Sequence, residues 1–274
     1  MSTFWRWALA VVITLGTLVW QRMTGPTYPA RGVVNLGGQP ISLKLGRSNS
    51  TASDQPVRVQ VADPRVTGEV VWRRYPSSEP WQVLELKREG GELLAMLPRQ
   101  PAAGKLEYQV RIRLGAEKGV FPARPAITRF RGDPPAAVLI PHILAMFLGM
   151  LFATRAGIEA LAPRRDLRRL AWATLGLFLV GGFVLGPLVQ HYAFAQWWTG
   201  IPLGWDLTDN KTLLATLAWV FAIWRLRGGR PARGTTLAAA LVTLVVFAIP
   251  HSAWGSQIDW GTLPGGQAAP ETNR

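Results

Sequence analysis

The sequence predicts a membrane protein of five helical spans, namely an N-terminal anchor and a four-helix bundle, with an all-β immunoglobulin-like sandwich inserted after the anchor. Apolar residues make up 49% of the 274 residues and gather in blocks, while charged residues make up only 17%. A soluble globular chain carries about 25% charged residues, and a block of about 20 apolar residues can cross a bilayer. Between the first two blocks, short alternating segments separated by turn signals are typical of a β-sandwich.

The first apolar block, residues 7–20, predicts an uncleaved membrane anchor over residues 1–23. A secretory signal peptide ends in small residues at its cleavage site, whereas this block ends in the bulky run Leu18-Val19-Trp20. Trp5 and Trp20 then fall at the two membrane interfaces, where tryptophan is enriched.

Residues 24–135 predict a separate β-domain. Segments of alternating apolar and polar residues indicate strands, and Gly37-Gly38 is one of the turn signals between them. Tyr108, at the start of a late strand, is predicted to be a tyrosine-corner residue. The domain holds no His, so we expect it to bind or position a partner rather than to catalyse. The strand segments are residues 41–45, 57–61, 69–73, 81–86, 93–97 and 106–112.

Four further apolar blocks predict the four-span bundle over residues 136–260. The loops at 155–169 and 225–233 carry five and four Arg, so the positive-inside rule places them in the cytoplasm. The N-terminus is then cytoplasmic, and the β-domain, the loop at 191–211 and a flexible tail at 261–274 lie outside. The four blocks are residues 136–153, 170–189, 212–224 and 235–250.

The net charge of +14 does not indicate a nucleic-acid partner. Residues 21–135 mix 18 basic with 10 acidic residues, and much of the remaining basic charge lies in the two Arg-rich loops. The bilayer is therefore the expected partner. The lack of Cys in the sequence excludes disulfides, thiolate metal sites, iron–sulfur clusters and covalent c-type haem.

The chain holds three His, and the predicted topology places all of them at outer span ends. His142 opens the second span, His191 closes the third and His251 closes the fifth. Asp206 and Asp209 lie in the outer loop. Imidazole and carboxylate ligands suit divalent Zn, Cu and Fe, and three His with an open position are typical of catalytic zinc. These five residues are the predicted metal ligands, and we expect the three rings to converge.

Two other interpretations of these residues stay open. A b-type haem is also held by His from different helices at one level. Alternatively, the imidazoles are interfacial or hydrogen-bonding groups, and Asp206-Leu207-Thr208-Asp209 is a helix start with Thr208 or Asp209 as its N-cap. Lys211 is in addition a candidate for binding an anionic head group.

Two features within the predicted spans indicate helix packing. Arg155 and Glu159 are four residues apart, a spacing that predicts a structural ion pair on one helix face. Gly181 and Gly182 interrupt the third span, and small residues permit close approach between membrane helices.

Several segments resemble a group of uncharacterised bacterial integral membrane proteins. The resemblance covers most of the chain and implies the anchor, β-domain and four-span layout. It also implies a bacterial inner (cytoplasmic) membrane, so that the outer side is the periplasm, but no activity, cofactor or substrate. The segments are QRMTGPTYP at 21–29, HYAF at 191–194, WTG at 198–200, DLTDNKT at 206–212 and IPHS at 249–252.

Two classes of function follow from these expectations. In the first, the outer rim binds a divalent metal or haem and supports redox or metal-dependent chemistry at the membrane interface. In the second, the chain is a non-enzymatic accessory, assembly or scaffolding protein. Its β-domain would then dock a periplasmic or membrane protein, and its rim His would be structural.

Overall fold

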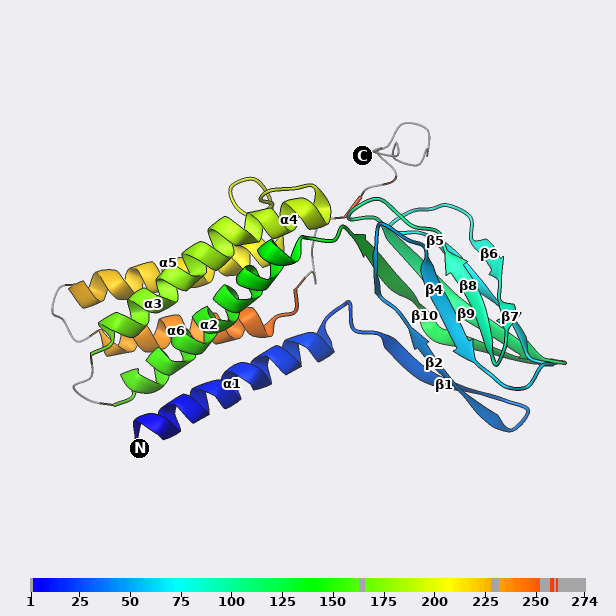
Figure 1. Cartoon of the computed structure of the whole chain (residues 1–274), viewed down its shortest axis with the longest axis horizontal. Coiled ribbons are helices and arrows are strands. Elements are labelled where there is room, and N and C mark those ends of the chain that lie inside the picture. The colour runs from blue at the N-terminus through cyan, green and yellow to red at the C-terminus, as the bar shows by residue number, and fades with distance from the viewer. Residues whose placement is uncertain (1, 163–165, 228–231, 252–256, 259, 261–274) are drawn as a thin grey trace. The chain divides into compact units, whose positions relative to one another are not determined.

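The computed structural model describes residues 2–162, 166–227, 232–251, 257, 258 and 260, and the chain divides into two compact units (Figure 1). The helical unit combines Met1–Gly25 with Pro134–Ser256, and the β unit combines Pro26–Asp133 with Gln257–Arg274. The N-terminal helix therefore belongs with the other helices, and the chain returns to the β unit at residue 257. The predicted tail at 261–274 lies outside the described residues.

Five helices form the described part of the helical unit. The third is continuous over Arg168–Phe194, but its middle is π-helical. The helices are α1 (Thr3–Thr24), α2 (Ala136–Ala160), α3 (Arg168–Phe178) with η1 (Leu179–Leu185) and α4 (Gly186–Phe194), α5 (Leu207–Arg227) and α6 (Arg233–Ala248).

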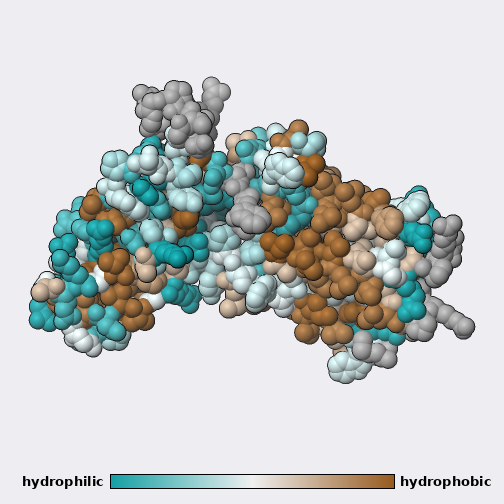
Figure 2. Space-filling view, turned by 180° about the vertical axis from the view of Figure 1, so that it is seen from behind, coloured by the Kyte–Doolittle hydropathy of each residue, from teal (hydrophilic) through white to brown (hydrophobic). Residues whose placement is uncertain are grey.

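Three of these helices are long and apolar enough to cross a membrane, namely α1, α2 and the continuous helix Arg168–Phe194, while α6 is a shorter apolar helix. Figure 2 shows apolar side chains over much of the visible face of the helical unit. These helices indicate a membrane protein.

Small residues line the core of the helical unit. Seven buried alanines, among them Ala153 and Ala215, pack with larger side chains such as Trp219 and Phe178. Small side chains let membrane helices approach closely. The indole N–H of Trp219 donates to the Thr243 hydroxyl at 2.9 Å, which satisfies a buried polar group and joins α5 to α6.

The predicted glycine contacts are present in the third helix. A Cβ on Gly181 would lie 2.9 Å from the sulfur of Met146, and a Cβ on Gly182 would lie 2.4 Å from a methyl of Thr212. The absence of side chains at these two positions thus lets η1 approach α2 and α5.

The N-terminal helix packs into the bundle along its length rather than standing alone as an anchor. Near its start, Arg6 Nη1 lies 2.8 Å from Glu159 Oε1 of α2. Near its end, the Gln21 amide donates to the backbone carbonyl of Phe247 in α6 at 2.6 Å. These contacts tie α1 to two other helices.

The β unit holds two five-stranded sheets. Neighbouring strands are antiparallel except for β10 and β3, which pair in parallel. The first sheet has the order β1 (Ala30–Leu36), β2 (Gln39–Leu45), β4 (Gln55–Gln60), β8 (Glu92–Leu97) and β7 (Lys87–Glu89); the second has β3 (Ser48–Ser50), β10 (Glu117–Arg131), β9 (Lys105–Leu114), β5 (Thr67–Arg74) and β6 (Gln82–Glu85).

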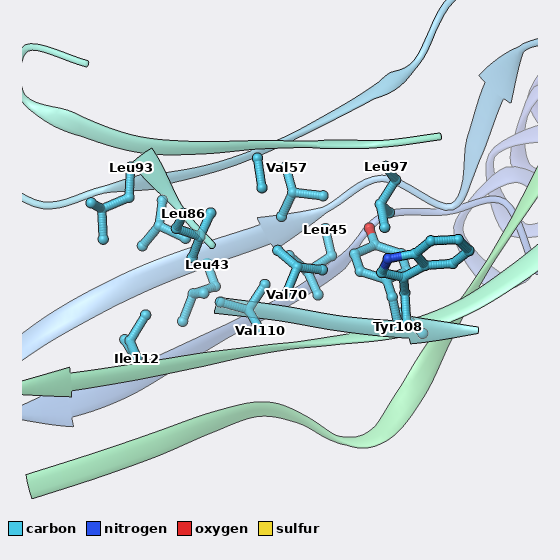
Figure 3. Close-up of a cluster of buried hydrophobic side chains, with 14 of the residues drawn as sticks. Leu43, Leu45, Val57, Val70, Leu86, Leu93, Leu97, Tyr108, Val110 and Ile112 are labelled. Atoms are coloured by element: carbon cyan, nitrogen blue, oxygen red, sulfur yellow. The ribbon is translucent and has the colours of Figure 1, made fainter. Parts of the chain in front are cut away.

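Both sheets contribute to one hydrophobic core. Figure 3 shows Leu43, Val57 and Leu93 of the first sheet with Val70 and Val110 of the second in this cluster. The alternation of buried and exposed residues along β4 and β9 explains why each sheet buries one face.

Tyr108 differs from the predicted tyrosine corner. Its buried hydroxyl donates to the backbone carbonyl of Gly46 at 2.6 Å, 62 residues earlier in the chain, rather than to a nearby upstream residue. The Gln55 amide donates to the same hydroxyl at 3.2 Å. Because Gly46 directly follows β2, Tyr108 links the two sheets.

Candidate functional site

The predicted ligands lie at one end of the helical unit, where α2 and α5 begin and α4 and α6 end; we call it the His end. The opposite end, where α1, α3 and α6 begin and α2 and α5 end, is called the Arg end. The three His therefore lie toward the same end of the helical unit, in α2, in α4 and shortly after α6.

His142 is held by the π-helical segment of the third helix. Its Nδ1 lies 2.8 Å from the Gly181 carbonyl oxygen. Because a carbonyl only accepts, Nδ1 carries the proton and donates, and the neutral ring keeps its lone pair on Nε2. In a π-helical segment the backbone hydrogen bonds run from i to i+5 instead of i to i+4. Gly181 lies in such a segment, and its carbonyl oxygen accepts from the His142 side chain.

His251 follows α6 and contacts a buried lysine of α5. Lys211 Nζ lies 3.2 Å from His251 Nδ1 and donates to the Ile249 carbonyl at 2.8 Å. The Lys211 side chain is almost fully buried, with 3% of its surface exposed. An ammonium group has three donors and no acceptor, so both neighbours act as acceptors, and Lys211 fixes the end of α6 against α5.

His191 lies in an aromatic contact near the end of α4. Its ring stacks on Trp197, with centroids 4.2 Å apart and planes 12° apart. Tyr192 contacts the same ring edge-on at 6.0 Å. The His191 ring therefore packs against the loop that follows α4, because Trp197 lies in that loop.

Asp209 anchors that loop to the first turn of α5. One carboxylate oxygen accepts from the Thr199 backbone N–H at 2.7 Å and from the Thr199 hydroxyl at 3.1 Å. The Gln190 amide lies 2.7 Å from the same hydroxyl, so α4, the loop and α5 meet at Thr199. Asn210 adds a second anchor, because its side-chain oxygen accepts from the Ile201 N–H at 2.8 Å.

The N-cap of α5 is Asp206, not Thr208 or Asp209 as predicted. The Asp206 carboxylate accepts from the Thr208 backbone N–H at 2.7 Å, and the helix begins at Leu207. An N-cap residue directly precedes the first helical residue and accepts from the N–H of the second. Because α5 begins at Leu207, this residue is Asp206.

The structure does not bring the predicted ligands together as a metal site. Within the described ranges, no three His, Cys, Asp or Glu side chains are grouped so that they could hold a metal ion. Each predicted ligand instead bonds to or stacks on a residue outside the predicted set. The partners are Gly181 for His142, Trp197 for His191, Lys211 for His251, Thr208 for Asp206 and Thr199 for Asp209.

A second buried polar cluster lies at the Arg end. The predicted pair of Arg155 and Glu159 is confirmed, and Arg6 of α1 pairs with the same carboxylate. All three side chains are less than 10% exposed. The Arg155 guanidinium also lies over the ring of Trp7 at 5.3 Å. Arg6 of α1 and Arg155 of α2 thus share the carboxylate of Glu159, and the pair with Arg6 joins α1 to α2.

Sequence reasoning missed the roles of Thr199, Gln190 and the carbonyl of Ile249. Thr199 and Gln190 act through partners nine or ten residues away, and Ile249 acts through its backbone carbonyl. No local sequence pattern reveals such contacts. Lys211 carried a usable signal, because it is the one lysine of the sequence outside residues 24–135. A lone lysine next to an apolar block predicts a partner at a helix end.

Comparison with protein-family models and with curated proteins finds no match for this chain.

Proposed function

We propose that the chain is a non-enzymatic accessory or scaffolding protein of the bacterial inner membrane, which holds its β unit in the periplasm for a protein partner. One observation carries this proposal. The polar residues of the His end, above all Asp209 and Lys211, make contacts between α4, the loop after it, α5 and the end of α6. Side chains that hold helices and a loop together in this way support a structural role for the His end.

Five membrane spans are part of the proposal. The 21 residues of α5 give a helix about 30 Å long, which matches the hydrocarbon thickness of a bilayer. Leu217 and Phe221 of α5 and Val245 of α6 are more than half exposed. Lipid contact accounts for these exposed side chains without the cost of apolar surface in water.

The proposed topology rests on the charge of the two ends. Besides the buried Arg6 and Arg155, the Arg end carries Arg168, Arg169, Arg225, Arg227 and Arg233 among the described residues. The positive-inside rule assigns this end to the cytoplasm. The His end, and with it the chain leading into the β unit, then faces the periplasm.

An immunoglobulin-like sandwich is the proposed class of the β unit. Two five-stranded, mostly antiparallel sheets with a common core support this assignment. Such domains bind other proteins through loops or sheet faces, and the composition of this unit, without any His, favours binding over catalysis.

The metal or haem hypothesis keeps one specific observation in its favour. His142 donates its Nδ1–H to a backbone carbonyl, which is how metal-binding His are commonly oriented, and leaves Nε2 with a lone pair. A metal at the His end would then use His142 as a first ligand, with chemistry at the outer membrane interface.

Metal analysis of the purified full chain and its His variants separates the two functions. If the His end is structural, elemental analysis will show no stoichiometric metal and the absorption spectrum no Soret band. His142→Ala will lower the melting temperature, and His142→Asn, which keeps a side-chain N–H toward Gly181, will restore part of the loss. One metal or haem per chain, lost in each of His142→Ala, His191→Ala and His251→Ala, would overturn the accessory proposal.

A further inference from the structure

We propose that the Arg end binds the phosphate of an anionic phospholipid between α3 and α5. This inference rests on the proposed membrane location of the helical unit and names a lipid partner for it. Its residues are Arg168 and Trp172 of α3 and Arg227 of α5.

Two guanidinium groups are braced across the α3–α5 contact. Arg168 Nη2 donates to the backbone carbonyl of Leu226 at 3.0 Å, which crosses from α3 to the end of α5. In the opposite direction, the Arg227 guanidinium lies over the ring of Trp172 at 5.1 Å. Each contact leaves most of the N–H donors of its guanidinium available, since an arginine has five.

The surroundings of these two arginines are positive. Arg168, Arg169 and Arg227 are exposed and Arg225 is half-buried. Among the described residues, the ion pairs of the helical unit are those of Glu159 with Arg6 and Arg155, so none of these four arginines is neutralised by a carboxylate in an ion pair. Asp166 is the acidic residue nearest in sequence, and it accepts from the backbone N–H of Arg168.

Phosphate is the anion that this arrangement fits best. A guanidinium presents a planar fork that matches phosphate oxygens, and basic clusters between membrane helices bind anionic lipid head groups. The exposed rings of Trp172 and Trp224 favour a phospholipid over a free phosphate ion. Tryptophan at a membrane interface packs against the glycerol and upper acyl region, which free phosphate lacks.

Native mass spectrometry of the delipidated full chain in a neutral detergent tests the site. Phosphatidylglycerol and phosphatidylcholine with the same acyl chains are titrated separately, and the bound lipid is counted. We expect phosphatidylglycerol to bind about tenfold more tightly, because the choline cation of phosphatidylcholine offsets the several-fold gain that each of the two arginines contributes toward an anionic head group. Millimolar inorganic phosphate should not displace the lipid.

The decisive variant is Arg168→Gln/Arg227→Gln, which should lose the preference for phosphatidylglycerol. Lys118→Gln/Arg124→Gln removes the same charge from exposed positions of the β unit and should keep it. Arg227→Lys retains the charge without the planar fork and should lose part of the preference for phosphatidylglycerol. This milder change tests the site even if the double variant does not fold. Equal binding of both lipids, an unchanged preference in the double variant, or displacement by inorganic phosphate would overturn the proposal.

Carbonate extraction of cell membranes distinguishes this failure from failure of the proposed function. Release of the wild-type chain by alkaline carbonate would contradict membrane spanning itself. Retention of the chain with no lipid preference would contradict only the phospholipid site.

Discussion

Asp209 holds the loop between α4 and α5 to the first turn of α5, because its carboxylate accepts from both the backbone and the hydroxyl of Thr199. Asp209→Ala should therefore lower stability by about 2 kcal/mol, since a hydrogen bond to a charged group contributes about 1.5–3 kcal/mol. Asp209→Asn keeps an acceptor oxygen and should lose less. Thermal unfolding of the full chain in detergent measures both, and equal melting temperatures for wild type and Asp209→Ala would contradict the anchoring role.

Lys105 gives the β unit a predicted pH dependence. Burial, assisted by the charge of Arg129, lowers the pKa of Lys105 from 10.5 to about 8, and its Nζ donates to Gln257 Oε1 at 2.9 Å. Between pH 8 and 10.5 the unfolded chain binds more protons at this group than the folded chain. The Lys105 contribution to stability should therefore rise with pH across that window.

Comparison with Lys105→Met isolates this effect from other titrating groups. The difference in melting temperature between wild type and variant, followed by the strand signal in circular dichroism, should shift in favour of the wild type from pH 7.5 to 9.5. Burial also raises the pKa of Tyr108, and that group acts in the opposite direction above pH 10. A difference that is flat over this range would contradict the assignment to Lys105.

Individual residues were predictable where the contact is local. Arg155 and Glu159 lie one helical turn apart, so their spacing is enough to predict the pair. Tyr108 and Gly46 are 62 residues apart, and Asp209 reaches Thr199 across a loop, so these contacts depend on the folded chain. The metal site was predicted from three His at one level, but depth in a membrane fixes neither ring direction nor neighbours.

At the scale of elements, the absence of a side chain at Gly182 lets η1 approach α5 closely. Gly182→Ala places a methyl 2.4 Å from the Thr212 methyl, and such overpacking costs about 1–3 kcal/mol. Gly176→Ala is the matched control, because nothing lies within 4 Å of its Cβ on the same helix. We expect a lower melting temperature for Gly182→Ala alone; equal effects would show that η1 does not pack closely on α5.

The carboxylate of Glu159 pairs with one arginine of α1 and one of α2. Glu159→Gln leaves Arg6 and Arg155 buried without their shared anion, and breaking a buried pair costs about 3–5 kcal/mol. Gly16→Ala in α1 faces open space and should be neutral or slightly stabilising. Protease sensitivity of α1 and the melting temperature report the change, and a Glu159→Gln chain as stable as Gly16→Ala would refute the role of the pair.

Most strands with a regular pattern were predicted, but β1, which also alternates, and the irregular β10 were not. The alternation along β4 and β9 appears in the sequence as alternating apolar and polar residues. The longest strand, β10, escaped prediction because Pro122 and Pro125 interrupt it, and its register with β9 shifts between Phe121 and Ala126. Proline removes a ladder hydrogen bond and demotes a strand in any sequence pattern.

At the scale of the whole molecule, the distribution of apolar residues along the sequence predicts a membrane part and a β part. Blocks of apolar residues and a stretch of alternating segments predict this division, because bilayer and water select different patterns. The assignment of α1 to the helical unit instead follows from Arg6 and Gln21, whose partners in α2 and α6 are more than 150 residues away in the chain. Such contacts leave no local trace in the sequence.

The central claim is that the helical unit spans a membrane with its Arg end in the cytoplasm and the β unit on the other side. Because the sequence holds no Cys, single cysteines can be introduced without background. Ala116 in the β unit and Arg169 at the Arg end are both exposed. A membrane-impermeant maleimide should label Ala116→Cys in intact cells and Arg169→Cys only after the inner membrane is opened. Labelling of Arg169→Cys in intact cells, or protection of Ala116→Cys, would contradict the account.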